Sequence, residues 1–442
     1  MLDYDYKSIL RVAIPLMGST FIQSIVLISD SSFLSRYGTL SFDAVGNGGL
    51  IYITMFMALA GLNEGTQILI ARRVGEKKES FLPSIFGSAM LANILLASSL
   101  LLIAWFLLPN FILGNTKNLN LAELQVDYLG IRSFGMIPSI LSLATIAYFV
   151  AIGKTSVVLI SSIGIAVSNI GLDYVLIFGK LGFAEMGVKG AALASTVADC
   201  IGALMIFSAL IFSKHSRNHR MLIDLNITKQ TLRELIKISF PLMLQSCIAL
   251  LTWTIFFIWI EQMGVFELTV SQNIRSLYFL AFVPILGFGA ATKTYISQAI
   301  GHNELKALPI IIRRVQLLTM LFLIILFHGA LLYPELMISI INPDKTFISE
   351  SAQTLQFVFF SILLYGFVSV YFFTIAGSGN TRFTFIIELI SIIIYLSMAY
   401  LFIKVLSFDI YWVWTVEYIY FGSIGLLSVF YLKKANWKSK KL

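Results

Sequence analysis

Two short stretches, Ile14-Pro15-Leu16-Met17 and Phe240-Pro241-Leu242-Met243, show one pattern in the two halves of the chain. The offset that carries Pro15 onto Pro241 aligns further positions without a gap, which indicates an internal repeat. These positions are Tyr37-Gly38 with Met263-Gly264, Gly61 with Gly287, Thr66 with Thr292, Gly75 with Gly301, and Gly153-Lys154-Thr155 with Gly379-Asn380-Thr381.

Around these stretches, apolar runs long enough to cross a hydrocarbon core recur along the chain; such a crossing needs about 20 residues. The predicted spans are 12–34, 47–70, 84–108, 127–151, 157–178, 189–213, 238–260, 270–297, 310–333, 353–376, 383–404 and 409–432. Six spans precede and six follow one long polar break, so both copies enter the membrane in the same sense. The sequence predicts an all-α polytopic membrane protein of about twelve transmembrane helices, in two parallel six-helix lobes with a central cleft. We expect an N-terminal lobe of residues 1–213, a cytoplasmic inter-lobe loop of 214–232 and a C-terminal lobe of 233–442.

Composition excludes a large soluble protein and a nucleic-acid binder. Only 12% of the 442 residues are charged and 58% are hydrophobic, whereas soluble domains carry roughly 25% charged residues. The net charge of +8 is spread over short clusters between apolar runs, and no continuous basic face carries interleaved aromatics. Such clusters indicate membrane topology and contacts with membrane lipid, not binding of nucleic acid. Cys200 and Cys247 lie inside apolar spans and form no disulfide framework or metal site.

The distribution of basic residues predicts the orientation. Of the 31 Lys and Arg, 22 fall in the termini and the connections on one side, and 8, Arg132 among them, fall on the other, with Lys293 inside a span. Basic residues accumulate on the cytoplasmic side of bacterial-type membrane proteins. We therefore expect a multi-pass protein of the cell inner (plasma) membrane, with both termini in the cytoplasm.

Carboxylates inside the spans of the first half are the candidate functional groups. Asp30 lies in the first span; Asn169 and Asp173 are four residues apart and therefore share a helix face. In the sixth span Ser195, Thr196 and Asp199 add oxygen atoms. A charge at the centre of a span costs at least about 2.5–3.5 kcal/mol, and oxygen ligands suit sodium as well as protons. The repeat places apolar or aromatic residues at three of these positions, namely Phe256, Tyr395 and Ala399.

Each of these groups also has a structural interpretation, as a satisfied hydrogen bond between helices. Pro15 and Pro241, at equivalent places in the two halves, indicate a structural bend, and a moving hinge is the alternative. The charges Glu64, Lys293, Glu388 and Glu417 also lie in or near spans, where some could line the cleft. His215 and His219 are four apart but have no visible third ligand, so no metal site is predicted at the two histidines. The one metal ion that we expect is a possible sodium at Asp30, Asn169 and Asp173.

At these residues the sequence resembles the multidrug and toxic compound extrusion (MATE) family, in the superfamily that also contains polysaccharide and lipid-linked oligosaccharide flippases. The resemblance covers nearly the whole chain. It rests on Ile14 to Gly38, Gly65 to Lys78, Gly153-Lys154-Thr155, Asn169 to Gly179, Met186 to Ala194 and Gly377 to Arg382.

The resemblance implies a two-lobed secondary active transporter that exports organic, mostly cationic compounds or drugs in exchange for protons or sodium. The family's first-lobe ion site carries over to Asp30, Asn169, Asp173 and Ser195. Thr196, next to Ser195, is the alternative for the hydroxyl ligand. The seventh and tenth spans, where some members have acidic residues, contain no carboxylate, so no ion site is expected in the second lobe. A flippase for a lipid-linked saccharide precursor is the alternative, although no strongly basic cavity is seen. An intramembrane enzyme is not expected, because the spans hold no nucleophile–base set and no His-rich motif. We expect a monomer with no cofactor apart from the coupling ion.

Overall fold

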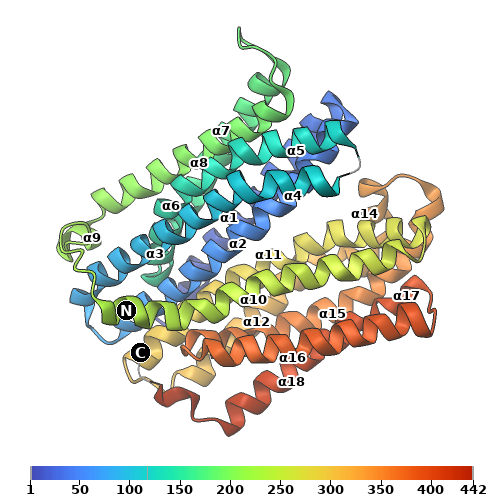
Figure 1. Ribbon diagram of the computed structural model, residues 1–442. Helices are drawn as coiled ribbons and strands as arrows, with labels where there is room; N and C mark the ends of the chain where they lie inside the picture. The colour runs from blue at the N-terminus through green and yellow to red at the C-terminus, as the bar shows by residue number, and fades with distance from the viewer. Residues whose placement is uncertain (1, 117, 441–442) are drawn as a thin grey trace. The chain divides into compact units, whose positions relative to one another are not determined.

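The computed structural model describes residues 2–116 and 118–440, and over these ranges the chain is helical with short connections and no strand (Figure 1). Twelve helical segments are long and apolar enough to cross a membrane. Each overlaps one of the twelve spans predicted from the sequence, so that prediction is confirmed. Helices are the expected form, because a backbone in lipid must satisfy its own hydrogen bonds.

The elements of the first half and of the polar break include two short 3₁₀ turns and one π turn. They are α1 Tyr6–Tyr37, α2 Thr39–Gly75, η1 Glu79–Phe81, α3 Leu82–Leu102, η2 Ile103–Leu107, α4 Leu108–Asn115, α5 Leu119–Arg132, η3 Ser133–Gly135, α6 Met136–Ala151, α7 Ser156–Phe178, α8 Gly187–Phe212 and α9 Lys214–Asn218.

The second half repeats the arrangement with its own π turn. Its elements are α10 Lys229–Glu261, α11 Val265–Gly301, α12 Leu308–Phe327, α13 Gly329–Leu332, α14 Pro334–Ile341, α15 Lys345–Gly377, α16 Thr381–Tyr400, η4 Leu401–Val405, α17 Ile410–Val413, α18 Thr415–Lys434 and η5 Trp437–Ser439.

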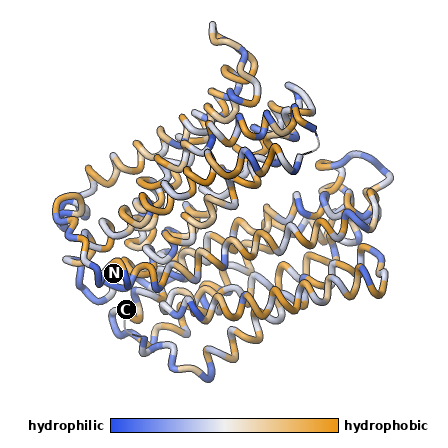
Figure 2. Tube along the Cα trace, viewed as in Figure 1, coloured by the Kyte–Doolittle hydropathy of each residue, from blue (hydrophilic) through white to orange (hydrophobic). Residues whose placement is uncertain are grey.

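Several helices run further than the apolar runs that predict them. The second span, predicted as 47–70, belongs to α2, which begins at Thr39 and ends at Gly75. Likewise α15 begins at Lys345, where the Asp344 side chain caps it by accepting a hydrogen bond from the Thr346 backbone nitrogen at 3.0 Å. Polar residues at the ends of a helix prolong it into the headgroup region, and Figure 2 shows hydrophilic residues gathered in the connections and at helix ends. The hydropathy of the sequence thus predicts where a helix crosses the membrane but not the polar turns at its two ends.

The described residues form two compact units, each taking a piece of the other half of the sequence. One unit is Gly18–Met243, and the other is Met1–Met17 with Leu244–Leu442. This grouping differs from the predicted lobes of 1–213 and 233–442, because packing assigns the start of α1 to the second half and the start of α10 to the first. The two division points, after Met17 and after Met243, are equivalent positions of the sequence repeat.

In each unit, the start of the other half's first helix packs closely against a glycine. We call this arrangement the exchange of helix starts. In one unit, α2 packs against α10, and a Cβ on Gly61 would lie 2.6 Å from the Met243 Cα. In the other unit, a Cβ on Gly287 of α11 would lie 2.3 Å from Met17 Cγ of α1. Small residues allow helix backbones to approach closely in membranes. The repeated glycines therefore mark the helix crossings at which each unit packs against the start of the other half's first helix.

Pro15 and Pro241 are buried within α1 and α10, and both helices run on through them. Each proline lies just before a division point. The predicted bend at Pro15 stays a prediction, since the helix is continuous there.

Candidate functional site

The predicted polar residues of the first half gather within the unit Gly18–Met243. Asn169 and Asp173 of α7 are 1% and 0% exposed. The Asp30 side chain, half-buried on α1, faces this pair, and its carboxyl group lies near enough to interact with Asp173 and with the Asn169 amide. Two helices far apart in the sequence thus bring two carboxyl groups and an amide together.

On α8 the two adjacent hydroxyls behave differently. Ser195 Oγ accepts a hydrogen bond from Asn169 Nδ2 at 3.2 Å, which joins it to the carboxylate group. Thr196 Oγ1 donates to the Ala192 carbonyl of its own helix at 2.8 Å. The geometry therefore favours Ser195 as the hydroxyl of the cluster.

Four buried oxygen atoms of this cluster accept no hydrogen bond from the described residues. They are Asp30 Oδ1, Asn169 Oδ1 and both carboxylate oxygens of Asp173. Buried polar atoms are nearly always satisfied, so a group of orphaned acceptors needs a physical explanation. Because all four are oxygens on side chains that face one another, a hard cation or a proton would satisfy them.

Asp199 has a different environment from the one the sequence suggested. Arg132, at the end of α5, donates from Nη1 to Asp199 Oδ2 at 2.6 Å, and its guanidinium lies 4.0 Å from the ring centre of Tyr52. The sequence interpretation counted Arg132 among the charges on the outer side. In the structure the side chain of this arginine is 13% exposed, neutralises one carboxylate and lies near enough to Asp30 to act on it.

The charges in this cluster do not balance. Asp30, Asp173 and Asp199 supply three carboxyl groups, and Arg132 supplies one positive charge opposite them. With every carboxyl group ionised, the cluster would carry two excess negative charges around the fully buried Asp173. An isolated buried charge is strongly unfavourable, so such groups bind a counter-ion or a proton. The arrangement is chemically suited to hold one exchangeable cation or proton between Asp30 and Asp173.

The equivalent positions in the second half build an aromatic core instead. Phe256 and Tyr395 pack with Trp414. A carboxylate nevertheless occurs beside them: Glu417 of α18, only 2% exposed, accepts hydrogen bonds from Tyr278 Oη at 2.9 Å and Tyr395 Oη at 3.1 Å.

Glu388 of α16 is held in the same way by the hydroxyl of Tyr420. Tyrosine hydroxyls satisfy both glutamates, whereas the carboxyl group of Asp30 faces a second carboxyl group. The sequence alone indicates no partner for either glutamate, because the tyrosines that bind them lie on other helices and no sequence pattern links them to the glutamates.

Comparison with known proteins places the chain among transporters. The MatE family model matches it twice, over residues 15–175 and 241–401. The two matches begin at Pro15 and Pro241, the same pair of positions that the internal repeat aligns.

Relatives cover the chain end to end at low identity. The probable multidrug resistance protein NorM of Thermotoga maritima is 23% identical over 98% of this chain and 93% of its own length. The probable multidrug resistance protein YoeA of Bacillus subtilis is also 23% identical, over 99% of this chain and 95% of its own.

Solved structures share the fold. An outward-facing multidrug resistance MATE family transporter of the MOP superfamily superposes with a TM-score of 0.87 at 19% identity, covering 99% of this chain and 97% of that one. A MOP superfamily transporter from Pyrococcus furiosus gives 0.86 at 18% identity, with the same coverage. With both halves matched by one family model and twelve apolar helices in the same fold, this multi-pass membrane protein belongs to the MatE (MATE) family.

Proposed function

We propose that the protein is a secondary active transporter that exports organic, mostly cationic compounds or drugs from the cell in exchange for protons or sodium ions. The export of drugs is supported by the multidrug resistance relatives, which match nearly the full chain. The coupling to a cation is supported by one observation above all: three carboxyl groups, Asp30, Asp173 and Asp199, stand opposite the single cation Arg132.

Coupling follows from this imbalance if the two carboxyl groups of Asp30 and Asp173 are nearer together in one conformation than in another. A proton or sodium ion between them then stabilises the closer arrangement, because a ligand shifts a conformational equilibrium by its differential affinity. Linkage is reciprocal, so a substrate cation that prefers the other arrangement and the coupling ion weaken each other's binding. Asn169 and Ser195 supply neutral oxygens for the ion, while Asp199 is already paired with Arg132.

A flippase for a lipid-linked saccharide is less well supported. Such a substrate carries a phosphate, and its pocket needs excess positive charge. Arg132, the cation of the cluster, is already paired with Asp199, which leaves the region acidic.

We also propose that the protein lies in the cell inner membrane as a monomer, with both termini in the cytoplasm. The excess of Lys and Arg on that side of the predicted topology supports the orientation.

The test is transport of a fluorescent organic cation by the purified protein in liposomes, with a proton gradient and a sodium gradient imposed separately. We expect one of the two gradients to drive accumulation, and the variants Asp30→Asn and Asp173→Asn to abolish it at unchanged protein abundance. Asp127→Asn is the matched control, because Asp127 is a partly exposed carboxylate of the same unit, paired with Lys189 at 3.2 Å. Full driven transport by either cluster variant, or equal loss in the control, would refute the proposed coupling site.

A further inference from the structure

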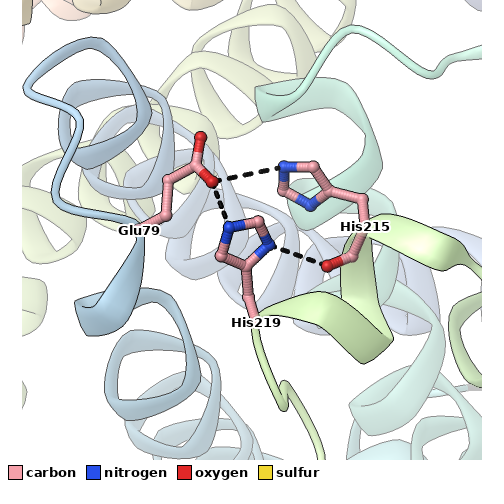
Figure 3. Close-up of side chains that lie close together, drawn as sticks. All are labelled: Glu79, His215 and His219. Atoms are coloured by element: carbon pink, nitrogen blue, oxygen red, sulfur yellow. Dashed lines mark hydrogen bonds and ion pairs between the residues drawn. The ribbon is translucent and has the colours of Figure 1, made fainter.

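A cluster of metal-ligating side chains lies outside the region discussed so far, at the end of the same unit where η1 and α9 meet. Figure 3 shows Glu79 of η1 pointing at the two imidazole rings of His215 and His219, which stand on α9 and directly after it. One ligand atom from each of the three residues lies within 4.8 Å of the others. The sequence shows the two histidines without a third ligand, because Glu79 lies more than four helices earlier in the chain.

Both histidines direct the same ring nitrogen toward the carboxylate. The His215 Nε2 lies 3.8 Å from Glu79 Oε2, and the His219 Nε2 contacts the same oxygen. A simple ion pair between Glu79 and one histidine would leave the second ring free to turn elsewhere. Instead the two rings lie 4.4 Å apart between centroids and converge on one oxygen atom.

The opposite nitrogen of each ring is held by a second partner. His219 Nδ1 bonds to the His215 backbone carbonyl at 2.8 Å, and His215 Nδ1 bonds to the Tyr148 hydroxyl at 2.7 Å. Metal-binding histidines in proteins nearly always have such an outer partner, which fixes the tautomer and the direction of the ring. The carbonyl accepts a hydrogen bond, so Nδ1 of His219 carries a proton, and in the neutral tautomer Nε2 holds the lone pair that a metal ion between this ring and Glu79 would accept.

The cluster is also accessible from solvent. The side chains of His215, His219 and Glu79 are 23%, 25% and 32% exposed, so an ion and a water molecule can reach them.

We propose that Glu79, His215 and His219 form a binding site for a divalent transition-metal ion such as Zn²⁺. Two imidazoles and one carboxylate are a common ligand set for zinc, and a water molecule would complete a tetrahedron. Bonds of about 2.0–2.1 Å put tetrahedral ligand atoms roughly 3.4 Å apart. The present spread of up to 4.8 Å therefore closes through modest rotations of the Glu79 and His215 side chains.

A bound ion would fasten the connection between the two halves of the sequence. His215 and His219 belong to the polar stretch 214–232, whereas Glu79 belongs to the link between α2 and α3. The buried side chains Ser216 and Met221 already anchor this stretch to the unit. The site would act as a metal-dependent clamp on that stretch, separate from the carboxylate cluster of Asp30 and Asp173.

The experiment is a zinc titration of the full-length protein, purified in detergent with its affinity tag removed and followed by isothermal titration calorimetry. We expect one ion per chain, with affinity at least tenfold weaker in His219→Ala and in Glu79→Gln. Tyr148→Phe removes only the outer partner of His215, and the loss of such partners typically weakens binding by about 10–100-fold.

His328→Ala is the matched control. His328 also bonds through Nδ1 to a backbone carbonyl, that of Ile325 at 2.7 Å, and through Nε2 to the hydroxyl of Tyr333 at 2.6 Å. Its ring thus resembles those of the cluster, but within the described part of the chain it belongs to no group of metal-ligating side chains. The zinc affinity of this variant should equal that of the wild type.

Thermal unfolding of each variant without metal shows that the fold is kept, and Glu79→Gln retains a polar side chain of the same size. The proposal fails if the wild type binds no zinc at about 100 µM, a weaker affinity than protein zinc sites show. It fails equally if His219→Ala and Glu79→Gln bind zinc as well as the wild type does.

Discussion

The crossing of α2 and α10 allows a sharp prediction about stability, namely that Gly61→Ala destabilises the protein although alanine is the better helix former. A Cβ on Gly61 would lie 2.6 Å from Met243 Cα, 2.7 Å from Met243 N and 2.9 Å from the Leu242 carbonyl carbon. These are backbone atoms, which cannot rotate away. The two helices must therefore separate by about 1 Å to reach ordinary contact distance.

The magnitude follows from what this separation disturbs. Overpacking of a close interface costs about 1–3 kcal/mol. The hydrogen bond from Ser239 Oγ to the Leu62 carbonyl, 2.9 Å long, would stretch, and such bonds in membrane proteins contribute about 0.6 kcal/mol on average. Replacing a helical glycine by alanine returns about 0.5–1 kcal/mol. The net loss should be about 1–3 kcal/mol.

The assay compares Gly61→Ala with Gly46→Ala, a glycine of the same helix with no described atom within 4 Å of its added Cβ. Unfolding by heat and by a denaturing detergent, in the same mild detergent background, should show the first variant less stable and the second equal to the wild type or slightly more stable. The reasoning is refuted if the two variants unfold alike. A further check is Gly287→Ala, which should cost less because the backbone atoms that its Cβ would meet lie at 3.1 Å or more, and the one closer atom, Met17 Cγ, belongs to a side chain.

Three further predictions concern charge and topology. Arg132→Gln should destabilise the unit because it leaves the half-buried Asp199 without its partner, at a cost below the roughly 3–5 kcal/mol of a fully buried pair, and the double variant Arg132→Gln/Asp199→Asn should recover much of that loss in the same unfolding assay. Trypsin should cut the exposed stretch around Lys229 in inverted vesicles and leave it intact from outside whole cells; cleavage from outside would reverse the proposed orientation. Finally, affinity for a fluorescent cation should depend on pH between about 5 and 8 or on sodium, and this dependence should vanish in Asp173→Asn; retention of the full dependence in the variant would exclude Asp173 as the coupling group.

The repeat and the spans could be predicted from the sequence because both depend on local information. Each of the twelve long apolar runs predicts a membrane span independently of the residues that pack against it. Asn169 and Asp173 share a helix face because their spacing is close to one helical turn. Asp30 stands out in the same way, as a carboxylate inside an apolar run.

Partners supplied by other helices were beyond the reach of such reasoning. Arg132 counted as an outer charge because nothing in its own run indicates Asp199, which is 67 residues away. Glu79, far from the histidines it faces, was missed for the same reason. The exchange of helix starts was missed because an apolar helix has the same pattern whichever unit it packs against. The pairing of the tyrosines with Glu417 likewise depends on helix packing alone.

The exchange of helix starts has a consequence for the order in which the protein is made. The segment up to Met17 is synthesised long before the rest of its unit, which starts at Leu244: Ser8 bonds to Tyr295, and the Tyr4 carbonyl accepts from Arg314. At roughly 5–20 residues per second, the N-terminal segment waits on the order of 15–60 s for these partners. The unit Gly18–Met243, by contrast, lacks nothing once Met243 has been synthesised. The unit Gly18–Met243 should therefore assemble first, and the segment up to Met17, although synthesised before it, should be among the latest to dock.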